Sequence, residues 1–101
     1  FGIPHGIASS ITLLPLLEIN SHLIRETLDK ICTNVSLTLD ELRQVIINIP
    51  KDVIPYTLSE WGVTKNQLDQ IVEGAFTTGR MDNNIVNLTA KNVKNILLEI
   101  Y

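Results

Sequence analysis

The chain has 101 residues, 45% of them hydrophobic, and a formal net charge of −3. A chain of this length is one domain, and its hydrophobic content is enough for a modest core. Acidic and basic residues are interspersed, so the chain lacks the clustered positive charge by which proteins bind nucleic acid or anionic lipid. We therefore expect neither nucleic acid nor a membrane surface among its partners.

The single cysteine, Cys32, has no partner for an internal disulfide, and its amphipathic surroundings suit a buried thiol in the reducing cytoplasm. The apolar stretch from Ile3 to Ile19 contains His5, Pro15 and Glu18 and has no basic leader. It is therefore expected to be a buried core helix and not a membrane span or a signal peptide. Because the chain begins at Phe1 in mid-motif, we expect it to be part of a longer protein.

Apolar residues recur at helical spacing throughout, and no alternating strand pattern competes with them, so the sequence predicts an all-α fold, a compact bundle of about five helices. The first helix is predicted from about His5 to Ile19, buried on most of its faces and kinked at Pro15. Its apolar side chains fall on two faces: Ile7, Ile11, Leu14 and Leu17 on one, Leu13 and Leu16 on the other.

The second predicted helix begins after a cap at Asn20 or Ser21. Its apolar stripe consists of Leu23, Ile24, Leu28, Ile31 and Cys32. The third opens at a capping box formed by Thr38 and Glu41 and is closed by Pro50.

Thr57 and Glu60 mark a short turn of helix that ends at Gly62. The residue pair Thr64 and Gln67 forms another capping box, before a helix that should end near Gly79. After a polar loop, Thr89 caps the last helix, whose inward residues are predicted to be Val93, Ile96, Leu97 and Ile100.

The strongest candidate for a functional residue is His5, which lies between Pro4 and Gly6 at the mouth of the first helix. Such a rigid end suits a metal ligand, although a lone histidine at a helix start is more often a cap or a surface residue. A metal site needs three or four ligands. The other histidine, His22, lies beyond the far end of the same helix, so any metal at His5 must be completed from outside this chain.

Three stretches together resemble the iron-containing, or group III, alcohol dehydrogenases. Residues 2–20, GIPHGIASSITLLPLLEIN, resemble the family's segment around Pro-His-Gly. Residues 57–63, TLSEWGV, and residues 79–84, GRMDNN, followed by Leu88 and Thr89, resemble two later motifs in the same order. The family has Asn at the position of Ser9, and Pro-Arg where this chain has Ile85 and Val86. The likeness covers essentially the whole chain but only the C-terminal part of such an enzyme.

The resemblance implies that residues 1–101 are one helical domain, the C-terminal part of the helical domain in a dehydroquinate-synthase-like fold, with the dinucleotide-binding domain absent. It implies that His5 is a ligand of a divalent metal, Fe or Zn, whose other ligands lie upstream. The metal would polarise an alcohol or aldehyde, and hydride would pass between the substrate and NAD(P). The isolated fragment is expected to be inactive and to bind no cofactor tightly. The parent is expected to be a cytoplasmic enzyme that can form a homo-oligomer.

Several alternatives stay open from the sequence. The parent could be a related glycerol dehydrogenase or maleylacetate reductase, or the chain could be a non-enzymatic interaction module whose first helix docks in a partner's groove. Ser9 and Ser10 either line a pocket or bond back to helix carbonyls. Phe1 could form a wall of the substrate pocket. Trp61 is interpreted as a packing anchor between helices in preference to a substrate contact, and the loop residues Arg80, Asp82 and Asn84 as a structural turn in preference to a cofactor contact.

Overall fold

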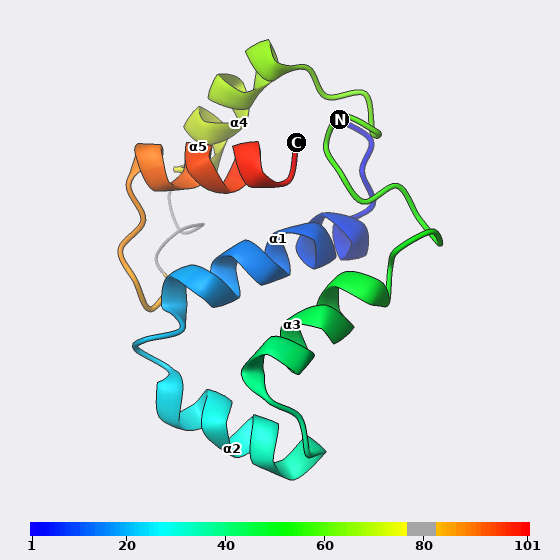
Figure 1. The fold of residues 1–101 in the computed structure, drawn as a ribbon. Coiled ribbons are helices and arrows are strands. Elements are labelled where there is room, and N and C mark those ends of the chain that lie inside the picture. Colours follow the sequence, from blue (N-terminus) through cyan, green and yellow to red (C-terminus); the bar gives the residue numbers. More distant parts are fainter. Residues whose placement is uncertain (77–82) are drawn as a thin grey trace.

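The computed structural model describes residues 1–76 and 83–101. Within these residues the chain forms five α-helices and one short 3-10 helix, and no strand, so the predicted all-α fold is confirmed. Figure 1 shows α1 (His5–Asn20) crossing the middle of the molecule, with α4 (Leu68–Ala75) and α5 (Ala90–Glu99) on one side and α2 (Arg25–Val35) and α3 (Leu39–Asn48) on the other. The molecule measures 41 × 32 × 19 Å, and its smallest dimension is about that of two packed helices.

The first helix has the predicted extent but not the predicted burial. α1 packs against both α5 and α3, and Pro15 is buried within it together with Ile11. The side chain of Leu13, by contrast, is 50% exposed. The expectation that α1 is buried on most of its faces is therefore wrong, because in a body two helices thick even the central helix keeps an outer surface.

The second helix begins later than predicted, at Arg25, and neither Asn20 nor Ser21 caps it. The hydroxyl of Ser21 donates to the carbonyl of Glu18 at 2.9 Å, and the carboxamide of Asn20 is paired with Asn84. Both side chains thus serve the end of α1 instead of the start of α2. On the predicted apolar stripe, Leu28 is buried, Ile24 and Cys32 are half-buried, and Leu23 and Ile31 are 54% and 43% exposed.

The third helix begins at the predicted capping box. The backbone N–H of Glu41 donates to the Thr38 hydroxyl, and the Glu41 carboxylate accepts from the backbone N–H of Thr38, both at 3.1 Å. Arg43 fastens α3 to α1, since its Nη2 lies 3.1 Å from Glu18 Oε2 and its Nε bonds to the other carboxylate oxygen. Its Nη1 also lies 2.6 Å from Asp40 Oδ1. The hydrogen bond that Arg43 donates to Glu18 is the largest cause that raises the pKa of Arg43.

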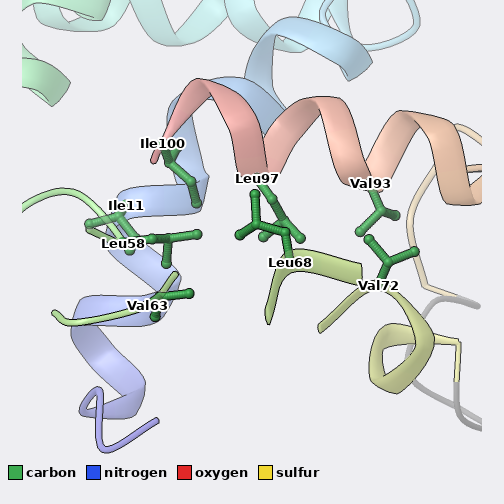
Figure 2. Packing of buried hydrophobic residues seen from close by; sticks show 8 residues of the cluster. All are labelled: Ile11, Leu58, Val63, Leu68, Val72, Val93, Leu97 and Ile100. Atoms are coloured by element: carbon green, nitrogen blue, oxygen red, sulfur yellow. The ribbon is translucent and has the colours of Figure 1, made fainter. Parts of the chain in front are cut away.

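The hydrophobic core lies between α1, α4 and α5 (Figure 2), and Leu68 at its centre is 1% exposed. All four residues predicted to face inward from α5 are buried. The N-cap of α5 is Thr89, whose hydroxyl accepts from the N–H of Asn92 at 3.2 Å, so the predicted cap is confirmed.

The side chain of Gln67 accepts from the backbone N–H of Thr64 at 2.8 Å, ahead of the 3-10 helix (Lys65–Gln67) and α4. The predicted end of α4 near Gly79 lies outside the described residues.

The segment from Thr57 to Gly62 forms consecutive turns and not the short helix that was predicted. As at the start of a helix, the first backbone N–H groups of these turns have no partner within the segment. The N–H of Leu58 donates to the carbonyl of Ile100 at 2.8 Å, and the N–H of Ser59 donates to the carbonyl of Tyr101 at 3.2 Å. The turns therefore receive the C-terminal end of α5. Gly62, at φ +80°, ends them in the left-handed conformation that glycine adopts most easily.

Glu60 organises the start of these turns. Its carboxylate accepts from the backbone N–H of Tyr56 and from both the backbone N–H and the hydroxyl of Thr57, each at 3.0 Å. The hydrogen bond from the Tyr56 N–H is the largest cause that lowers the pKa of Glu60 below its ordinary value of 4.5, followed by that from the Thr57 hydroxyl.

We predict that Glu60→Gln flattens the acid dependence of stability. A carboxylate whose pKa is lowered by folding stabilises the protein above its unfolded-state pKa, and this stabilisation is lost as the pH falls through the folded-state value. Urea unfolding of the chain and its variant between about pH 7 and pH 3, a range that spans the glutamate pKa, measures the effect. Glu73→Gln is the control, since the Glu73 carboxylate has no hydrogen-bond partner among the described residues. Equal slopes for both variants would contradict the assignment.

Candidate functional site

His5 is the first residue of α1 and follows Pro4, whose carbonyl accepts from the N–H groups of Ile7 and Ala8 at 3.0 Å each. The helix start is therefore formed by the backbone and needs no side-chain cap. The imidazole is exposed, and neither of its nitrogens has a partner among the described residues. The interpretation of His5 as a cap is thus wrong, and the ring is left available to bind a ligand.

The second histidine cannot join His5 at one metal. His22 follows the C-terminal end of α1, and a helix of 16 residues is about 24 Å long at 1.5 Å per residue. In the part of the chain that the structure describes, no three His, Cys, Asp or Glu side chains are grouped as a metal site. His5 therefore fits a metal as one exposed nitrogen ligand of a larger set, and a metal there would need further ligands from elsewhere.

A cavity of about 460 Å³ opens beside the first turn of α1. Phe1 and Ile3 line one side of it, and α1, α4, the C-terminal end of α5 and the turn residue Leu58 line the rest. Among the described lining residues, Thr12 and Gln70 have side chains with hydrogen-bonding groups, and no side chain is charged. His5 is not part of the wall, although Ile3 and Ala8 on either side of it are. A pocket of this size and character suits an uncharged, largely aliphatic ligand.

The two serines after His5 differ in their hydrogen bonds. The hydroxyl of Ser10 donates to the carbonyl of Gly6 at 2.7 Å, so for this residue the back-bonded alternative is confirmed. The hydroxyl of Ser9 has no partner among the described residues, and its side chain is exposed. Neither serine lines the 460 Å³ cavity, but Ser10 also lines a smaller pocket between α1 and the end of α3.

Asn84 belongs to a structural turn and is paired with the end of α1. Its Nδ2 donates to Asn20 Oδ1 at 3.1 Å and to the carbonyl of Val86 at 2.7 Å, and its Oδ1 accepts from Asn20 Nδ2 at 2.9 Å. Both side chains are half-buried. The pair joins two of the motifs found in the sequence, and sequence reasoning missed it because the partners are 64 positions apart. The other two loop candidates, Arg80 and Asp82, lie outside the described residues.

Trp61 fixes its own loop. Its indole Nε1 donates to the carbonyl of Pro55 at 2.8 Å, and the side chain is half-buried. Trp61 is not among the residues of the core cluster, and its role as a packing anchor between helices stays a prediction. A loop indole that satisfies its N–H locally adds rigidity to the segment between α3 and α4.

We predict that Asn20→Ala and Asn84→Ala each lower the free energy of unfolding by about 1–2 kcal/mol, because each leaves the other carboxamide half-buried and unpaired. The double variant should lose less than the sum of the two. Urea unfolding measures all three variants, with exposed Asn83→Ala as a control expected to change stability by less than about 0.5 kcal/mol. Strict additivity would show that the pair is not coupled.

The chain is similar to the NADPH-dependent butanol dehydrogenase of Clostridium saccharobutylicum. The two are 34% identical over 113 aligned positions, which cover all of this chain and 29% of that protein. The chain thus spans less than a third of its relative's length. Models of known protein families give no match, and neither do the solved structures. None of the helices of the described residues is long and apolar enough to cross a membrane.

Proposed function

We propose that the chain is the C-terminal helical domain of a metal- and NAD(P)-dependent alcohol dehydrogenase of the iron-containing family, and that His5 supplies one ligand to its metal. The observation that carries this proposal is the 34% identity, over the whole chain, to an NADPH-dependent butanol dehydrogenase. The Pro4-His5-Gly6 motif lies inside the matched region and at an exposed helix start. The proposal places residues 1–101 in a dehydroquinate-synthase-like helical domain, with the nicotinamide-binding domain elsewhere in the enzyme.

The chemistry at His5 follows from its surroundings. A bound divalent metal supplies Lewis-acid polarisation of the alcohol or aldehyde oxygen. His5 contributes a neutral imidazole nitrogen, held by a helix that is packed on two sides, and moves no proton itself. The adjacent uncharged cavity would take the hydrocarbon part of the substrate and exclude water from it.

The alternatives fit these observations less well. Among the described residues no side chain that lines the cavity is charged, which disfavours a dicarboxylate such as the substrate of a maleylacetate reductase, because a buried carboxylate needs a charged or hydrogen-bonding partner. A docking helix presents its apolar face to a partner, whereas α1 already packs against α3 and α5. A cytoplasmic location is part of the proposal and rests on the single free thiol, Cys32.

We predict that His5→Ala in the full-length enzyme removes most of the bound metal and most of the turnover while the fold is kept. Loss of one ligand opens the metal's coordination shell, and an exposed side chain at a helix start contributes little packing. His22→Ala is the matched control, since His22 is also exposed but lies at the other end of α1. The His22→Ala variant should change the free energy of unfolding by less than about 0.5 kcal/mol.

The measurement is the metal content of the purified proteins by elemental analysis, beside the steady-state rate with NADPH and with NADH on linear alcohols. Circular dichroism checks the fold. If the His5 variant keeps full metal occupancy and a near-normal rate, the proposed ligand is wrong. If the unmodified enzyme oxidises no alcohol with either cofactor, the proposed activity is wrong.

A further inference from the structure

The surface of α1 divides into three strips. One strip, which includes Ile7 and Ile11, packs into the core beside α5. A second includes Ser10 and Leu13 and faces the end of α3 and Tyr56, whose hydroxyl donates to the Ser10 carbonyl at 3.1 Å. Residues four apart share a face of a helix, so His5 and Ser9 lie together on a third strip, which borders the second strip at Leu13. Both side chains are exposed.

The hydroxyl groups in the first turns of α1 differ in whether they donate a hydrogen bond to a helix carbonyl. Ser10 donates to the Gly6 carbonyl at 2.7 Å, and Thr12 donates to the carbonyls of Ala8 and Ser9 at 3.0 and 3.1 Å. The Ser9 hydroxyl and the His5 imidazole are the two polar groups of the first turns that have no partner among the described residues. They belong to the same strip, one helical turn apart.

We infer that Ser9 is a positioning residue for His5: when one ring nitrogen of His5 binds the metal, the Ser9 hydroxyl accepts a hydrogen bond from the other ring N–H. This inference rests on the proposed function. Side chains at i and i+4 have Cβ atoms about 5–6 Å apart, a separation that an imidazole and a hydroxyl can bridge. The Cα–Cβ bond of Ser9 also tilts toward the N-terminal end of α1, and so toward His5.

The chemistry of metal-bound histidine calls for such an acceptor. A histidine ligand donates its second ring N–H to an oxygen atom, which fixes the tautomer and orientation of the ring and raises its basicity. No carboxylate stands one turn from His5 on α1, and the helix carbonyls of its own turn are used by the backbone and by Ser10. Asparagine, the residue that the iron-containing alcohol dehydrogenases have at this position, also carries an acceptor oxygen.

The test compares four variants of the full-length enzyme. Ser9→Ala removes the acceptor oxygen, and Ser9→Asn replaces the hydroxyl with another acceptor. Ser10→Ala changes the neighbouring serine on another strip, and His5→Ala removes the proposed ligand. Metal affinity is measured by competition with a chelator of graded concentration, beside the melting temperature and kcat. We expect Ser9→Ala to weaken metal binding by about 10–100-fold, with an unchanged melting temperature because alanine favours an exposed helix position. Ser9→Asn should bind metal within a few-fold of the unmodified enzyme, and Ser10→Ala should match it.

The outcomes are distinct. If Ser9→Ala and Ser10→Ala bind metal equally tightly while His5→Ala loses it, Ser9 does not position His5 and the inference is overturned. If His5→Ala keeps its metal, the proposed function itself fails. Should Ser9→Ala not fold, Ser9→Val provides a second variant without an acceptor. If Ser9→Asn fails to restore affinity, the effect is not due to the acceptor oxygen and the inference is again overturned.

Discussion

The packing of α1 between α5 and α3 is the constraint on which the remaining elements depend. A helix that carries apolar side chains on more than one face is stable only when neighbours cover those faces. On one side the core does so, with buried residues from α1, α4, α5 and the turn that contains Leu58 and Val63. On the other side, α3 packs against α1, and the two are joined by the bidentate ion pair of Arg43 with Glu18. α2 contacts α3 in turn and contributes no residue to that core cluster.

This arrangement fixes the end of α1 at which His5 lies. A ligand side chain is useful only when the element that carries it is held in place, and sites on helices are more precise than sites on loops. The first turn of α1 is held by the backbone bonds to Pro4, and Ile7 in the same turn packs against the core. Its free strip, with His5 and Ser9, is the part of the helix that no other described element uses. Rigidity on two sides and an open third side are what a contributed metal ligand requires.

Local signals in the sequence predicted local structure well. The caps at Thr38 and Thr89 depend on residues three positions apart, and both are present as predicted. The inward stripe of α5 follows from helical periodicity alone. The start of α2 could not be predicted in the same way. Asn20 is a good helix cap by residue type, but its side chain is hydrogen-bonded to Asn84, a partner that no local pattern shows. The exposure of Leu13 depends on the thickness of the whole molecule, which no local pattern encodes.

The candidate site likewise combines features that local sequence predicts with features that it does not. That His5 stands at a helix start followed from Pro4 and from the periodicity of the apolar residues. The prediction that His5 is a metal ligand rests on no other residue in this chain, since the described residues do not group as a metal site. It came from the resemblance of the Pro4-His5-Gly6 stretch to a family. The cavity beside α1 could not be foreseen either, because its wall combines residues from both ends of the chain, from Phe1 to Ile100.

The most direct test of the central claim is a crystal structure of the full-length protein, with anomalous diffraction data collected at the absorption edges of iron and zinc. We predict one strong anomalous peak at about 2.0–2.1 Å from a ring nitrogen of His5, the distance typical of a histidine–metal bond. The remaining ligands would then come from outside residues 1–101. A metal bound elsewhere in the protein, with the imidazole of His5 in solvent, would contradict the claim.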